Sequence, residues 1–187
     1  MKVLGPTIKV ILAVGVISLI GMILFFKFWS IEGYVLHPIS FIEIQSERTK
    51  LIDGIESYQS INEFKGFLKL SSLQWEENTN PLSPKGRPPF NITTITIKNY
   101  LHLDYSGELI VSFFNNRLTS TNFYPKDVVG YFEAISKEGV TFDSNQEAKL
   151  PPHTHVYLAV DHKGRKYVDW ADVRLEKEVE LWIKRYS

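Results

Sequence analysis

The run 92–124 restricts the fold most, because apolar and polar residues alternate in it over three segments. Alternation with a period of two is typical of β-strands that bury one face. Asp104–Gly107 and Asn115–Asn116 separate the segments and suit tight turns, since glycine and asparagine tolerate positive φ. The middle segment, 108–114, is apolar on both faces. The run therefore predicts a three-stranded antiparallel meander with layers packed on both sides.

Helical patterns flank this meander. Ser60–Glu63 forms a capping-box sequence, which predicts a helix that ends near residue 69. Pro125 and Gly139 are a typical start and stop for a second helix, and a hairpin is expected over 156–170. A last helix is expected over 172–185, with these side chains inward: Leu175, Val179, Trp182 and Ile183. The fold class expected is α+β, a single domain with helices packed on an antiparallel sheet meander.

The N-terminal run 10–26 carries no charge and lies between Lys9 and Lys27. As a helix it nearly spans a hydrocarbon core of roughly 30 Å, so we expect one N-terminal transmembrane helix ahead of the α+β domain. No small residues that suit signal peptidase follow it, which favours a retained signal anchor over a cleaved signal peptide. The anchor residues expected are Val10, Leu12, Ile17, Leu19, Ile23, Phe25, Phe26 and Trp29.

Lysines before this run favour a cytoplasmic N-terminus. The localisation expected is the cell membrane, crossed once, with the C-terminal domain periplasmic or extracellular. The chain then divides into an anchor over 1–29, a stalk and first strand over 30–57, and the α+β domain over 58–187.

The proline-rich stretch 77–90 is expected to be a loop, because proline cannot join a central β-ladder. A loop of this length is uncommon unless it binds something, so it supplies the candidate partner-binding residues. These are Pro84, Arg87, Pro88 and Phe90. A plain spacer, and a lid formed by residues 78–90 over a small ligand, are the alternatives.

The chain has as many basic as acidic residues, 21 of each, and no cysteine. Balanced charge argues against nucleic acid as a partner, and the absence of cysteine excludes a thiolate metal site. No catalytic or cofactor-binding motif occurs, so we expect a protein that is not an enzyme and has no cofactor. His153 and His155 share one face of an expected strand, which leaves open a metal-binding protein or metal-dependent enzyme.

The capped helix, the loop and the meander, whose middle strand begins Gly107-Glu108-Leu109-Ile110, together resemble the small envelope domains of the SmpA/BamE type. Those domains are similar to the repeats of beta-lactamase inhibitor protein. The resemblance covers about residues 58–124 and implies a helix layer on an antiparallel sheet that binds or assembles proteins without a catalytic centre. It carries no functional residues over to this chain, which also lacks a lipobox cysteine.

The function expected is that of a membrane-anchored, non-enzymatic protein-binding module. It would act as an accessory subunit or as an assembly and stabilising factor of a membrane or envelope protein complex. Its expected partners are a membrane or envelope protein and, through the N-terminal helix, the lipid bilayer.

Overall fold

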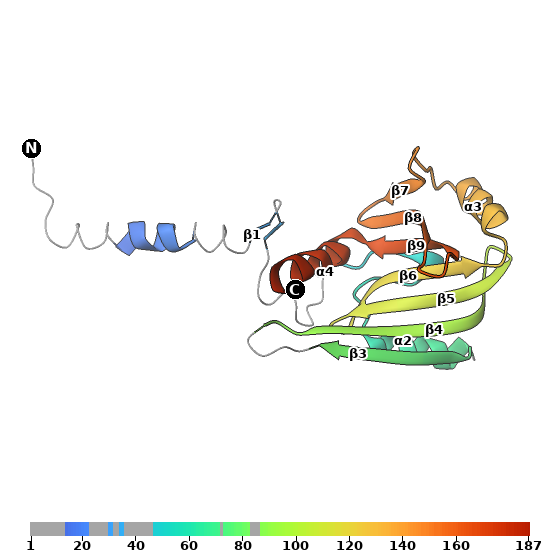
Figure 1. The fold of residues 1–187 in the computed structure, drawn as a ribbon, viewed down its shortest axis with the longest axis horizontal. Helices are drawn as coiled ribbons and strands as arrows, with labels where there is room; N and C mark the ends of the chain where they lie inside the picture. Colours follow the sequence, from blue (N-terminus) through green and yellow to red (C-terminus); the bar gives the residue numbers. More distant parts are fainter. Residues whose placement is uncertain (1–13, 23–29, 32–33, 36–46, 72, 83–86) are drawn as a thin grey trace, which may run out of the picture. The chain divides into compact units, whose positions relative to one another are not determined.

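The computed structural model describes residues 14–22, 30–31, 34–35, 47–71, 73–82 and 87–187 (Figure 1). The chain forms two compact units, residues 1–38 and 39–187. In the first unit, residues 14–22 are helical, and β1 (Ser30–Ile31) pairs with β2 (Tyr34–Val35) in an antiparallel two-stranded sheet. The first strand expected over 39–45 lies outside the described residues.

The predicted transmembrane helix is wrong. No helix in the described part of the chain is both long and apolar enough to span a bilayer. The expected fold class is therefore corrected, because it included this transmembrane helix. The expected single-pass membrane localisation is corrected for the same reason. Ile17 and Leu19 lie in that helix, and the other predicted anchor residues lie outside the described residues.

The second unit is built on one seven-stranded sheet in which every neighbouring pair is antiparallel. Its strands, in the order of the sheet, are β3 (Trp75–Leu82), β4 (Phe90–His102), β5 (Tyr105–Phe114), β6 (Arg117–Pro125), β9 (Lys166–Asp172), β8 (Thr154–Val160) and β7 (Glu147–Leu150). The meander β4–β6 and the hairpin β8–β9 agree with the prediction. Asn115 and Asn116 form the expected turn, with φ of 47° and 62°.

The sequence did not predict strand β3, because the prolines of the stretch 77–90 indicated a loop. Pro81 in fact pairs with Asn91, and β3 has a neighbour on one side only. On an edge strand the missing N–H of proline can face away from the ladder, so a proline is tolerated there. The expected loop over 77–90 is therefore wrong in its first half, and only the residues between β3 and β4 connect the two strands.

One face of the sheet is closed by two helices and by residues 51–58. Helix α2 (Ile61–Ser71) runs along β3 and β4 and buries Phe64 and Leu68 (Figure 1). It begins in the predicted capping box, where the amide of Glu63 donates to Ser60 Oγ at 3.3 Å and that of Ser60 to Glu63 Oε2 at 2.7 Å. The short 3₁₀ helix η2 (Ile52–Gly54) adds the buried Ile52 to this core, so Leu51, Ile52 and Ile55 of the expected stalk are core residues.

Helix α3 (Val128–Lys137) covers the same face beside β6, where Tyr131 packs on Phe123 with ring centroids 4.9 Å apart. The predicted start at Pro125 is wrong, since Pro125 is the last residue of β6. Asp127 caps the helix instead, because its side chain accepts the Gly130 amide at 3.0 Å. The end agrees with the expectation: Gly139 has a φ of 98° just after the helix.

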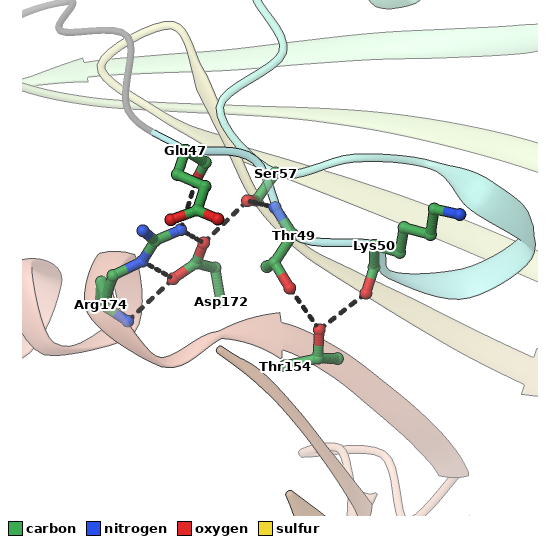
Figure 2. A network of polar contacts seen from close by, with 7 residues as sticks. All are labelled: Glu47, Thr49, Lys50, Ser57, Thr154, Asp172 and Arg174. Carbon is green, nitrogen blue, oxygen red and sulfur yellow. Dashed lines mark hydrogen bonds and ion pairs between the residues drawn. The ribbon is translucent and has the colours of Figure 1, made fainter. Parts of the chain in front are cut away.

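Helix α4 (Val173–Tyr186) continues from the end of β9 (Figure 1). Its first turn is fixed by a polar network that joins it to residues 47–57 (Figure 2). The fully buried Asp172 accepts Ser57 Oγ at 2.7 Å and the guanidinium of Arg174 at 2.6 Å and 2.9 Å. Ser57 also accepts the Thr49 amide at 3.0 Å, so the chain just before the core and the start of the last helix are held together.

Candidate functional site

The second face of the sheet is only partly covered, and the burial of β4, β5 and β6 shows it directly. Along these strands, residues on the face towards α2 and α3 are buried, whereas the alternate residues are half-buried. We call this second face the open face and define it by Thr94, Thr96, Ile110, Ser112, Ser120, Asn122 and Tyr124. Polar side chains predominate among them, as expected for a sheet face that meets water or a partner.

Helix α4 lies over one end of this face and leaves a groove of about 430 Å³ beside it. Glu176, Val179, Glu180 and Ile183 form its helix side, a stripe with the spacing of one helix face. Its sheet side includes Ile92, Ser112, Phe114 and Ser120. We call this the α4 groove. Its volume falls within the roughly 300–1,000 Å³ of ligand pockets.

The rotation of α4 differs from the prediction and creates this groove. Leu175, Leu181 and Trp182 are buried, whereas Ile183, expected inward, is 47% exposed at the groove. Trp182 explains the difference, because its ring packs on Phe90 with centroids 4.4 Å apart and its indole N–H donates to the Pro88 carbonyl at 3.1 Å. This packing of Trp182 orients α4 so that Glu176, Val179, Glu180 and Ile183 lie towards the open face.

A carboxylate cluster lies where the first turn of α4 meets β8 and β9. The Tyr157 hydroxyl is 2.7 Å from Asp169 Oδ2 and 3.2 Å from Glu176 Oε1. The Tyr157 hydroxyl can donate its single proton to only one of these two carboxyls. The other contact is a hydrogen bond when that carboxyl holds a proton and donates it to the hydroxyl oxygen. Asp169 is only 5% exposed, and its Oδ1 has no hydrogen-bond partner. Glu176 also lines the α4 groove, so it links the groove to the cluster.

Burial changes the acidity of both carboxyls. It raises the pKa of Asp169 to about 7, and the charge of Glu176 adds to the effect, whereas the hydrogen bond from Tyr157 opposes it. The pKa of Glu176 is also raised by burial, while the imidazole of His155 acts in the opposite direction. Neither carboxyl is paired with a lysine or arginine in the described part of the chain. Negative charge on either group is therefore poorly solvated and is not offset by a fixed lysine or arginine.

The predicted metal ligands lie at the start of β8, where His155 contacts this cluster. His155 stands between two glutamates, with Nε2 3.4 Å from Glu147 Oε2 and Nδ1 3.7 Å from Glu176 Oε2. His153 lies before β8, and its carbonyl accepts the Val173 amide at 3.1 Å. Among the described residues, no group of three or more His, Asp or Glu side chains is arranged to hold a metal ion. Metal binding by the two histidines stays a prediction.

A second groove of about 510 Å³ lies at the other end of the strands of the open face. The residues that characterise it are Lys98, Glu108, Tyr124, Lys126, Arg165 and Lys166. We call it the basic groove. Arg165 lies 4.4 Å over the Tyr124 ring, and its guanidinium donates to Asp161 at 2.8 Å and to Glu108 at 3.0 Å. These contacts fix the guanidinium and offset its charge, so the positive charge of the groove comes from its lysines.

The predicted partner-binding residues of the proline-rich stretch lie against the C-terminal end of α4. Phe90 packs on Phe114 and Trp182, Pro88 accepts the Trp182 indole, and the guanidinium of Arg87 donates to the carbonyl of Tyr186. Pro84 lies outside the described residues. The structure thus gives Pro88 and Phe90 a role in holding α4, and their contact with a partner stays a prediction.

Sequence reasoning missed the residues that form the cluster and the groove. Asp169 stands in a strand between Val168 and Trp170, where a charged residue is the one available signal. Glu176 lies in a segment of alternating charge, a pattern typical of a solvated helix face. Tyr157 had no signal, because its role depends on two carboxyls from other elements.

Comparison with known proteins assigns no family: no protein-family model matches this chain, and no curated protein matches it significantly.

Proposed function

We propose that this chain is a non-catalytic binding protein and that a protein partner covers its open face. The observation that carries the proposal is the unequal covering of the sheet. Two helices and residues 51–58 close one face, whereas the second carries half-buried residues along three long strands. A face of this kind, with a groove at each end, is large enough for an extended contact with a protein.

The charge at the two ends of this face supports a specific partner. The α4 groove ends at the carboxylate cluster, and the basic groove carries Lys126 and Lys166 beside the fixed Arg165. Opposite charges at the two ends would orient a partner that has the complementary arrangement. The resemblance to SmpA/BamE-type domains, which implies protein binding, favours the same class of function.

The cluster itself supports binding over catalysis. A general acid or base must reach the proton that it transfers. Asp169 is almost completely buried, and its Oδ2 is occupied by the Tyr157 hydroxyl. The same geometry that raises its pKa thus keeps it away from a substrate, which favours a structural role for this carboxyl.

Site-specific photo-crosslinking tests the proposal. A benzophenone amino acid is placed at Thr96 or Asn122 on the open face of the full chain, in the cells that naturally make it. The matched control position is Val129, which is 70% exposed on the outer side of α3. We expect the same discrete crosslinked protein from both open-face positions and none from Val129. Crosslinks of equal yield at all three positions, or none at any, would overturn the proposal.

A further inference from the structure

The α4 groove combines an apolar channel with a carboxylate at one end. Ile92 and Phe114 on the sheet face Val179 and Ile183 on the helix, and Glu176 closes the groove towards the carboxylate cluster. Of the two glutamates in the groove, Glu180 is exposed at the rim and pairs with Lys177 at 2.9 Å. Glu176 is half-buried and meets the His155 imidazole, Tyr157 and a second carboxyl.

We propose that the α4 groove binds an alkylammonium group, the side chain of a lysine on the protein partner, with its methylene groups in the apolar channel and its ammonium at Glu176. The occupant named here rests on the proposed function. A lysine side chain matches the groove because its stem is apolar and only its end is charged.

Charge complementarity argues for a cation at this position. Asp169 and Glu176 lie together, with Glu147 beyond His155, and Asp172 adds to the negative potential at Glu176. Desolvated carboxylates bind a cation strongly, because the cation replaces the water that they have lost. No lysine or arginine within the described residues fills this place, so a cation from outside can do so.

The contacts of Glu176 favour an ammonium over a guanidinium. Its Oε1 already faces the Tyr157 hydroxyl, and its Oε2 faces His155. A guanidinium binds a carboxylate best when both oxygens are free for two parallel hydrogen bonds. An ammonium acts as a compact charge with donors that rotate, so it can approach a carboxylate whose oxygens are partly engaged.

The test compares three probes of equal length: n-hexylamine, hexan-1-ol and hexanoate. Each is titrated into the full chain at pH 8, and amide chemical shifts of Ser112 and Ser120 report occupancy of the groove. We expect n-hexylamine to bind about tenfold or more tightly than hexan-1-ol, since a charge-assisted hydrogen bond contributes about that factor. Hexanoate should cause no shift at these residues.

Two matched variants locate the charge. Glu176→Gln should weaken n-hexylamine about tenfold and leave hexan-1-ol unchanged. Glu180→Gln, in the same groove, should change both affinities less than twofold. Equal affinity for the three probes, an unchanged affinity in Glu176→Gln, or equal losses in the two variants would overturn the proposal. Urea unfolding of both variants confirms that each is folded.

A final comparison decides the source of the ammonium. Nα-acetyl-lysine amide should bind at least as tightly as spermidine if a protein lysine is the occupant. Much tighter binding of spermidine would assign the groove to a free polyamine and overturn the lysine assignment. The crosslinking experiment on the open face is independent of these titrations, so failure of the lysine proposal and failure of the protein-binding function give different results.

Discussion

The Asp169→Asn substitution removes one buried carboxyl while it keeps the size of the side chain. Asn can still accept the hydroxyl proton of Tyr157, which lies 2.7 Å from Asp169 Oδ2. In the folded chain the pKa of Asp169 is raised to about 7, against an ordinary value of 3.8. The native state therefore binds this proton more tightly than the unfolded chain, so stability falls as the pH rises from about 4 to about 7.

The difference between these two pKa values corresponds to about 4 kcal/mol in the free energy of unfolding. Above pH 7 the wild-type chain carries this full penalty, whereas below pH 4 both states hold the proton and the penalty vanishes. We expect the Asn variant to match the wild type near pH 4 and to be more stable at pH 8, by up to about 4 kcal/mol.

Urea unfolding at pH 4, 5, 6, 7 and 8 measures this effect. The matched control is Asp104→Asn in an exposed turn, where asparagine suits the φ of 65°. Its stability should follow that of the wild type at every pH. Parallel pH curves for the wild type and Asp169→Asn would refute the reasoning, because they would show that the buried carboxyl takes up no extra proton on folding.

Two further predictions concern the packing of the unit. Gly107→Ala places a Cβ against the Tyr124 carbonyl and the Phe123 ring, so thermal unfolding should show that the free energy of unfolding falls by about 1–3 kcal/mol. Gly66→Ala in α2 is the control, because its Cβ meets nothing nearby, and it should raise the free energy of unfolding by about 0.5–1 kcal/mol. Ser57→Ala removes the hydrogen bonds to Asp172 and from the Thr49 amide, so urea unfolding should show a loss of about 1–3 kcal/mol. Ser136→Ala on the exposed side of α3 should change stability by less than about 0.5 kcal/mol; equal effects of the two serine variants would contradict this account.

Local patterns in the sequence were sufficient for elements whose signals are local. The Asn115–Asn116 turn, the Ser60–Glu63 capping box and the alternation over 92–124 each depend on a few neighbouring residues, and each occurs in the structure. Signals that depend on the rest of the molecule failed. Pro81 is compatible with a strand only because β3 lies at an edge, and nothing in the sequence shows which strand is at the edge.

The candidate site was hidden for the same reason. Tyr157, Asp169 and Glu176 come from β8, β9 and α4, and their meaning arises from their distances to one another. The apolar run 10–26 shows the opposite error. Its composition satisfied the criterion for a membrane span, but no helix in the described part of the chain is long and apolar enough to cross a bilayer.

The network of Figure 2 also determines when the unit can close during synthesis. Residues 47–57 leave the ribosome before their partners Thr154, Asp172 and Arg174, which lie more than a hundred residues further along the chain. Until α4 emerges, Ser57 has no carboxylate to bind, and the apolar residues between 51 and 55 lack the polar contacts that hold them against the sheet. Contacts across more than a hundred residues form slowly, because a long loop must close first. The order of synthesis thus delays completion of this network until the first turn of α4 is available.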